Sequence, residues 1–222
     1  NHAQVYSTFD DGYEFFGGAV QVDEFVALYA RYDSIDFSDG WIGGMNRALV
    51  IHSLTDGNRC VEGDNIGEGR ADGGEPLDFA PVTSPTLSNL TCVLSSNDDG
   101  THGDSEGITL RRGPQATFEN VLVYSGYGDA ANSTTSNECF ELDDDVTRNW
   151  AENGQTTMTN SLLACDEATK DSLENGEDIA NWVLDTPTVA GADYSFNSGN
   201  VIDTLDGGSP EVHAFDLSDD DL

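Results

Sequence analysis

The stretch Leu87-Ser88-Asn89-Leu90 recurs along the chain as Phe118-Glu119-Asn120-Val121 and as Met158-Thr159-Asn160-Ser161. In each copy apolar and polar residues alternate with a period of two, which is typical of a β-strand and not of a helix. Looser copies of this strand begin at Val22 and at Met45. Such self-similarity predicts a solenoid, in which each repeat buries its apolar face only against the neighbouring repeats.

A shorter strand precedes each of these copies. The five versions read Tyr13-Glu14-Phe15, Ile35-Asp36-Phe37, Val61-Glu62-Gly63, Ile108-Thr109-Leu110 and Phe140-Glu141-Leu142. Tyr13 and Ile35 lie 22 residues apart, a length that suits one coil of a parallel β-helix. We therefore expect an all-β fold, a right-handed parallel β-helix (solenoid) of about five to seven coils with long corner loops. Residues 1–185 are assigned to this β-helix, and residues 186–222 to a C-terminal strand or cap and an acidic tail.

Two coils carry insertions between their first and second strands. The longer insertion, from Asp64 to Pro85, is rich in glycine and acidic residues and is predicted to be a loop that leaves the coil. Such loops often carry the binding function of a repeat protein. A solvated loop without a ligand fits the sequence equally well.

Asn89, Asn120 and Asn160 occupy the same position in their repeats. Side-chain amides that stack in successive parallel coils can form a hydrogen-bonded ladder. We expect such a ladder here, with a structural role.

The first residues of the chain match the end of a second strand. Val5-Tyr6-Ser7-Thr8-Phe9 is similar to Val123-Tyr124-Ser125-Gly126-Tyr127, so the chain is expected to open midway through a coil. An uncapped terminal coil invites strand pairing with another chain. Val5, Tyr6 and Phe9 are therefore candidate residues for self-association, with copies of the same chain as partners, unless a removed upstream segment served as the cap.

The charge of the chain excludes some classes of partner. With 42 acidic and 8 basic residues, its formal net charge is −34. This disfavours nucleic acid and anionic membrane surfaces, because both are bound through basic patches. No run of residues is long and apolar enough for a transmembrane helix, and we expect no membrane insertion.

An acidic surface has three interpretations: it keeps a protein soluble at high salt, it binds Ca²⁺, or it repels other copies until cations bridge them. With Ca²⁺ as the cofactor, the candidate ligands are Asp10, Asp11, Asp143, Asp144 and Asp145. None of these clusters has the spacing of an EF-hand loop. For each one, a solvated acidic face is the plainer alternative.

The four cysteines occupy two matching positions in the repeats. Cys60 and Cys139 each precede a first strand, and Cys92 and Cys165 lie late in the second strands of the same coils. Pairing Cys60 with Cys92 and Cys139 with Cys165 would close the two coils that carry long insertions, although three connectivities are possible. Disulfides fit an oxidising compartment. A zinc site is the rival interpretation, but the chain has no Cys-x-x-Cys pair and its four histidines are scattered.

Several segments together resemble a known group of proteins. They are Asp10-Asp11-Gly12-Tyr13-Glu14-Phe15-Phe16-Gly17-Gly18, Cys60-Val61-Glu62-Gly63-Asp64-Asn65, Ser84-Pro85-Thr86-Leu87-Ser88-Asn89-Leu90-Thr91 and Gly107-Ile108-Thr109-Leu110-Arg111-Arg112-Gly113. Over residues 5–165 the chain resembles bacterial secreted right-handed parallel β-helix surface proteins, which are mostly uncharacterised. The resemblance implies export and an extracellular or cell-surface location. It assigns no catalytic residue.

Two main functions remain open at this point, and a third interpretation is a passenger or adhesin fragment of a larger surface protein. The first is an extracellular structural protein that self-associates, end to end into a filament or surface layer, with a cation-binding acidic surface. The alternative is a β-helix protein that binds or degrades polysaccharide in the manner of a lyase, with Arg111 or Arg112 beside the acids of neighbouring coils. Charge compensation in an acidic protein is the favoured explanation of these two arginines. No catalytic signature names a reaction, and the enzyme question stays open, with assembly favoured over catalysis.

Overall fold

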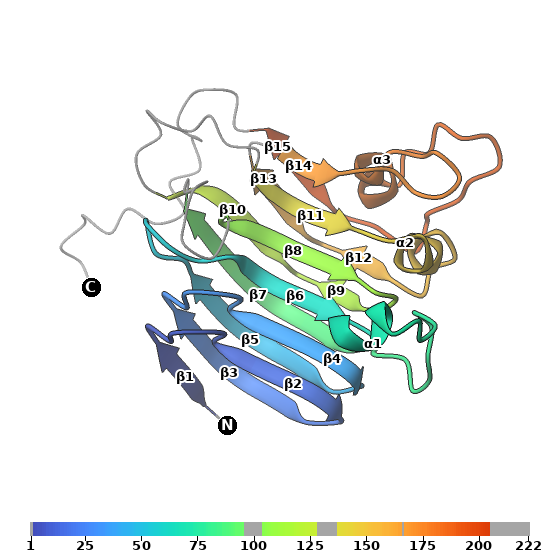
Figure 1. Ribbon diagram of the computed structural model, residues 1–222. Helices are drawn as coiled ribbons and strands as arrows, with labels where there is room; N and C mark the ends of the chain where they lie inside the picture. Colours follow the sequence, from blue (N-terminus) through green and yellow to red (C-terminus); the bar gives the residue numbers. More distant parts are fainter. Residues whose placement is uncertain (1, 96–103, 128–136, 166, 205–222) are drawn as a thin grey trace.

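The computed structural model describes residues 2–95, 104–127, 137–165 and 167–204. It confirms the predicted right-handed parallel β-helix, which has two facing sheets (Figure 1). Sheet A is formed by β1 (Ala3–Tyr6), β3 (Gln21–Leu28), β5 (Gly44–Ile51), β7 (Thr86–Ser95), β10 (Leu122–Tyr127), β13 (Leu162–Cys165) and β15 (Val201–Thr204), with β9 (Thr117–Glu119) and β12 (Thr157–Thr159) beside this path. Sheet B is formed by β2 (Tyr13–Gly18), β4 (Ile35–Trp41), β6 (Arg59–Asp64), β8 (Glu106–Arg111), β11 (Glu138–Leu142) and β14 (Glu167–Lys170).

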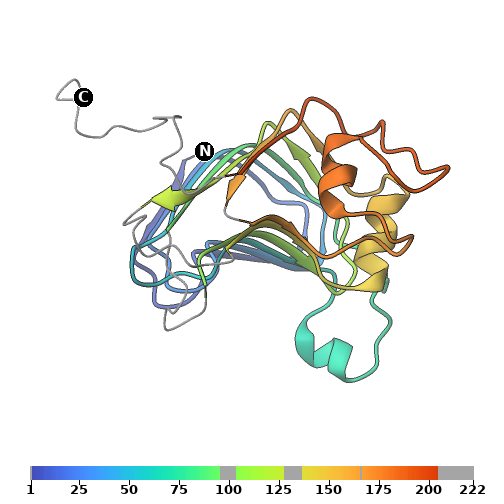
Figure 2. The same cartoon turned by 90° about the horizontal axis from the view of Figure 1, so that it is seen from above.

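The repeated phrases of the sequence stack on one another in register. In sheet B the stacked residues are Tyr13, Ile35, Val61, Ile108 and Phe140. In sheet A they are Val22, Met45, Leu87, Phe118 and Met158. All these side chains pack in the space between the two sheets, which is the core of the protein (Figure 2). Each coil therefore repeats the same inward positions, as the period-two pattern predicted.

Sheet A bends at one position in every coil. The residues at the bend have left-handed backbones, with φ between +52° and +69°. They are Glu24, Arg47, Asn89, Asn120, Asn160 and Gly199, each stacked on the previous one. Asparagine and glycine tolerate this conformation best, which explains why they occupy the bend in the later coils.

The predicted asparagine ladder runs along this bend, on the outer surface. The Asn120 Nδ2 atom donates to Asn89 Oδ1 at 3.1 Å, and Asn89 Nδ2 donates to Asn46 Oδ1 at 2.8 Å. Asn46 Nδ2 in turn donates to Asp23 Oδ1 at 3.0 Å. The ladder thus extends two coils further towards the N-terminus than the repeat indicated. Among the described residues, however, no hydrogen bond joins the Asn160 side chain to Asn120, so the predicted third asparagine is not part of the ladder.

Both predicted disulfides are present. Cys60 pairs with Cys92 and Cys139 with Cys165, so each bond ties the start of a sheet B strand to the sheet A strand of the same coil. No cysteine is left for a zinc site. These two coils carry the insertions that contain α1 (Glu68–Asp72) and α2 (Asp145–Glu152).

The two ends of the solenoid differ. At the N-terminal end β1 pairs with β3, with Val5 opposite Ala27, so these residues do occupy a second-strand position. At the other end α3 (Ile179–Leu184) places the fully buried Trp182 against Phe140, with ring centroids 5.8 Å apart. Within the segment 186–222, β15 adds a further strand to sheet A, and residues 205–222 of the expected acidic tail lie outside the described residues.

The left-handed bend gives a first prediction. Asn120→Val and Asn120→Gly both remove the ladder amide, but only valine is disfavoured at a positive φ. We expect Asn120→Val to lower the free energy of unfolding by about 1 kcal/mol more than Asn120→Gly. Urea unfolding of the two variants measures this, and equal stabilities would contradict the backbone explanation of the bend.

Candidate functional site

The outer face of sheet B carries a column of stacked polar side chains. From the N-terminal coil onwards they are Glu14, Asp36, Glu62, Thr109, Glu141 and Lys170. Neighbouring strands lie about 4.8 Å apart, so side chains at the same position of successive coils touch. The sequence therefore forces three carboxylates into adjacent places at the start of this column, and their repulsion must be compensated.

Basic residues compensate the charge in the middle of the column. The Arg59 guanidinium contacts Glu62 Oε2 at 2.8 Å and Glu106 Oε2 at 3.3 Å. Arg111 also contacts Glu62, and it lies 3.2 Å from Asp64 Oδ1. Burial lowers the pKa of Arg111, but the charges of Asp64 and Glu62 outweigh this effect and raise it.

The C-terminal part of the column is compensated in the same way. The Lys170 Nζ atom lies 3.0 Å from Glu138 Oε1 and 3.3 Å from Glu141 Oε1. Thr109 stands between two acidic positions and donates to Glu141 Oε2 at 3.4 Å. From the third coil onwards, each carboxylate in the column thus forms an ion pair or a hydrogen bond.

The first two coils hold carboxylates in close proximity. Asp11, Glu14 and Asp36 each offer an oxygen, and these three oxygens lie within 4.8 Å of one another. We call these three residues the acidic cluster. Asp36 Oδ1 is buried without a hydrogen-bond partner. Oxygen ligands in this arrangement suit a hard cation such as Ca²⁺.

The ionisation of the acidic cluster reflects its crowding. Burial raises the pKa of Asp36 to about 8, and the charges of Glu62, Asp11, Asp64 and Glu14 add to the shift. Burial likewise raises the pKa of Asp11 to about 7, although the backbone N–H of Asp33 opposes this by donating to Asp11 Oδ1 at 3.0 Å. At neutral pH the cluster therefore retains protons unless a cation replaces them.

The predicted cation ligands fall in different places. Asp11 belongs to the acidic cluster, whereas Asp10 is exposed beside it and outside the group. Asp144 caps helix α2, accepting from the Thr147 N–H at 2.9 Å and from the Thr147 hydroxyl at 2.6 Å. Asp143 precedes this cap and Asp145 begins the helix, so the structure does not bring these three acids together with Asp11.

Glu14 and Asp36 were not singled out from the sequence. The signal that identifies them is their shared place in the repeat, the middle position of Tyr13-Glu14-Phe15 and Ile35-Asp36-Phe37. Arg111 and Arg112 lie beside the acids of a neighbouring coil, as both interpretations of them expect, and Arg112 Nη1 lies 2.6 Å from Asp64 Oδ2.

The long insertion flanks this face. Figure 2 shows α1 standing out from the coil on the outer side of sheet B. Arg70 of α1 contacts Asp39 Oδ1 at 2.6 Å and lies over the Phe79 ring, 5.0 Å from its centroid. Asn65 Nδ2 donates to the carbonyl groups of Leu77 and Phe79. These contacts hold the insertion against β4 at Asp39 and fix its return segment to Asn65.

Comparisons with known proteins agree with this architecture. A family model for a pectate-lyase-like β-helix domain matches residues 1–199. No curated protein and no solved structure gives a significant match. Among the described residues, no helix has the length and apolar character needed to cross a membrane.

The raised pKa of Asp36 predicts a pH effect on stability in the presence of a chelator. Because the folded value of about 8 exceeds the ordinary value of 3.8, the folded state binds this proton more tightly than the unfolded state. The resulting stabilisation is complete below the ordinary pKa and is lost as the pH rises towards the folded pKa.

We therefore expect the free energy of unfolding of the wild type to fall relative to that of Asp36→Asn as the pH rises, by at most about 1.4 kcal/mol per pH unit. Urea unfolding at a series of pH values measures this, with Asp10→Asn as the exposed control. A difference between wild type and Asp36→Asn that stays constant with pH would contradict the assignment.

Proposed function

Because the chain belongs to the pectate-lyase-like β-helix family, we propose that it is an exported protein that binds polysaccharide on the outer face of sheet B through a Ca²⁺ ion. The acidic cluster of Asp11, Glu14 and Asp36 is the observation that carries this proposal. Two disulfides favour an oxidising compartment and so support export.

The proposed role of the cation follows from charge. Ca²⁺ takes about six to eight oxygen ligands, so three protein carboxylates leave positions for sugar hydroxyl or carboxylate oxygens. A chain with a net charge of −34 would repel an acidic polysaccharide without such a bridge. The cation would therefore both relieve the crowding of the cluster and attract the ligand.

The arginines of this face favour binding over lyase chemistry. Proton abstraction by a lyase needs a base that is free to accept a proton near the cation. Arg111 is held between Glu62 and Asp64, and their charges raise its pKa. Arg59 is held in the same way by Glu62 and Glu106. These contacts support a charge-compensating role for both side chains.

The cation part of the proposal predicts a specific loss. We expect isothermal titration calorimetry to show one Ca²⁺ site in the wild type, and Asp36→Asn to weaken its affinity by about tenfold or more, since it removes one of three anionic ligands. Asp10→Asn is the matched control, because it removes the same charge from an exposed neighbour. Equal weakening by both variants would show a diffuse charge effect instead of a site.

The ligand part is tested by co-sedimentation with insoluble or cross-linked neutral and acidic polysaccharides. We expect retention that requires Ca²⁺, is abolished by a chelator and is lost in Asp36→Asn. Retention of the protein on the polysaccharide that is unchanged by the chelator would contradict a bridging role for Ca²⁺. An unsaturated product, detected by its ultraviolet absorbance, would instead establish lyase activity.

End-to-end self-association is a second candidate function, supported by the N-terminal end of the solenoid. In the described part of the chain β1 and β2 are the edge strands of their sheets. Three aromatic side chains at this end of the solenoid are largely exposed: Tyr6 of β1 (65%), Phe9 (77%) and Phe16 of β2 (65%). Val5 of β1 packs against the core. Edge strands with exposed aromatic residues favour strand addition by another copy.

This candidate predicts filaments of the purified chain in negative-stain micrographs, shortened or absent in the double variant Tyr6→Ser, Phe9→Ser. Images with and without a chelator separate strand addition from bridging by cations. Monomers alone at high protein concentration, under both conditions, would remove this function.

A further inference from the structure

The outer surface of sheet A differs sharply from the rest of this acidic protein. Beyond the bend, alternate residues of each strand point away from the core and stack into two columns. The first column is Gln4, Val26, Leu49, Thr91, Leu122, Leu162 and Val201. The second column is Tyr6, Leu28, Ile51, Val93, Tyr124, Ala164 and Asp203. We call these two columns the sheet-A face.

The composition of the sheet-A face is the reverse of the overall composition. Although the chain has 42 acidic residues, Asp203 at the last strand is the one charged residue of these two described columns. Aliphatic and aromatic side chains fill most of the other places. Both ends of the face are open, with Tyr6 65% and Val201 54% exposed. Within the second column Val93 and Ala164 are only 8% and 5% exposed, so the accessible apolar surface lies mainly along the first column and at the two ends. An exposed apolar patch on a soluble protein marks an interaction site.

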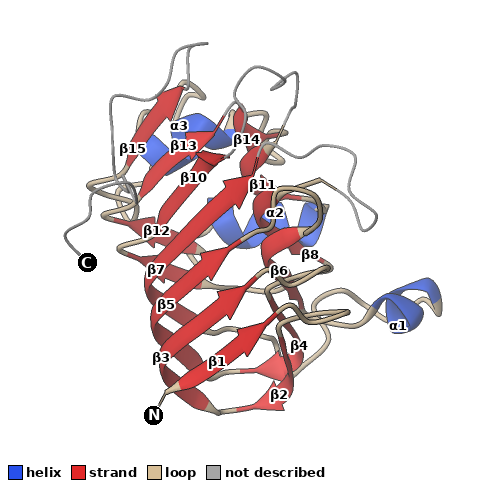
Figure 3. Cartoon of the chain, turned by 90° about the vertical axis from the view of Figure 1, so that its left-hand side faces the viewer, coloured by secondary structure: helices blue, strands red, loops and turns tan. Residues whose placement is uncertain are grey.

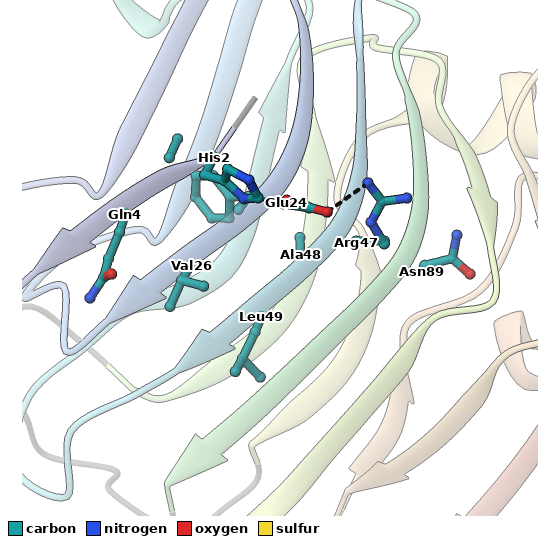
Figure 4. Close-up of a pocket in the computed structure, with 10 residues that line it drawn as sticks. His2, Gln4, Glu24, Val26, Arg47, Ala48, Leu49 and Asn89 are labelled. Carbon is teal, nitrogen blue, oxygen red and sulfur yellow. Dashed lines mark hydrogen bonds and ion pairs between the residues drawn. The ribbon is translucent and has the colours of Figure 1, made fainter.

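None of the described helices covers this face. Figure 3 looks onto the strands of sheet A, and α1, α2 and α3 lie behind or beside them. A groove runs along the bend, where Figure 4 shows Gln4, Val26 and Leu49 in one row beside Glu24, Arg47 and Asn89. The apolar columns are thus bordered by the polar side chains of the bend.

The dimensions of the face suit a small protein interface. Seven strands about 4.8 Å apart, most of them with four residues or about 13 Å beyond the bend, give roughly 450 Å² on one copy. Two copies packed face to face would bury about 900 Å², which is the size of a weak, transient contact. Twisted sheets pack well in this way when both faces are aliphatic.

Charge selects the orientation of a second copy. Two chains of net charge −34 repel each other over most of their surfaces. Contact through the sheet-A face keeps nearly all acidic groups out of the interface, and added salt screens the remaining repulsion. We propose that two copies associate as a symmetric dimer through the sheet-A face, and that ionic strength drives the association.

The experiment is sedimentation equilibrium of the full chain with chelator present, from about 0.1 M to about 3 M NaCl, over which screening becomes almost complete. We expect a weak dimer whose association constant rises with salt. Leu122→Glu places a negative charge in the middle of the face, where dimerisation would bury it. We expect this variant to weaken the dimer by about tenfold or more. Ile42→Glu, which adds the same charge at a site that is 54% exposed outside the face, should leave it unchanged.

Several outcomes would overturn the proposal. They are a monomer at every salt concentration, equal weakening by both variants, and a dimer that survives Leu122→Glu. Residues 205–222 are the other possible occupant of the face, so the chain ending at Thr204 is compared. If only this shorter chain dimerises, the C-terminal segment covers the face and the proposal fails. Thermal unfolding of Leu122→Glu confirms that the variant is folded, and Leu122→Thr, which keeps a strand-forming residue, should weaken the dimer less.

Discussion

Parallel stacking of identical positions is the constraint on which the rest of this structure depends. Each residue of a strand lies about 4.8 Å from its counterpart in the next coil. Residues at the same position of successive coils therefore form a column along the axis of the solenoid. Apolar positions such as Ile35 and Val61 thereby form a continuous core. The left-handed bend is likewise repeated from Glu24 to Gly199, because neighbouring strands can remain paired only if all of them turn at the same place.

The same constraint is unfavourable for charges, and the two sheets meet it differently. Sheet B places acids outward, and from the third coil on it neutralises them with Arg59, Arg111 and Lys170. In the first two coils no basic residue of the described part of the chain pairs with Asp11 or Asp36, and burial raises the pKa of both carboxyl groups. Sheet A avoids the difficulty by keeping its outward columns apolar. We therefore place cation binding on one sheet and association with a second copy on the other.

Much of this architecture could be predicted from the sequence, because the repeat fixes register. Aligning the phrases placed Cys60 in the same coil as Cys92, and it stacked Asn89 below Asn120. The position of Asp11 in the site could not be predicted in the same way. Asp11 lies in the turn before β2, and its approach to Asp36 depends on a hydrogen bond from the Asp33 backbone.

The sheet-A face could not be predicted from the sequence for a different reason. Strict alternation from Val22 would place Glu24 and Val26 on the inward side. At the bend, however, Asp23 and Glu24 both point outward, so the pattern shifts by one residue and Phe25 becomes the buried position. Only the backbone conformation at residue 24 reveals this shift, and with it the outward direction of Val26 and Leu49.

We propose that the acidic cluster holds protons which a bound cation displaces. Calorimetry in buffers of different ionisation enthalpy gives the number of protons released per Ca²⁺ bound at pH 7. With pKa values of about 7 for Asp11 and about 8 for Asp36, we expect the release of roughly one to two protons. Calcium binding without proton release, or no binding at all, would contradict it.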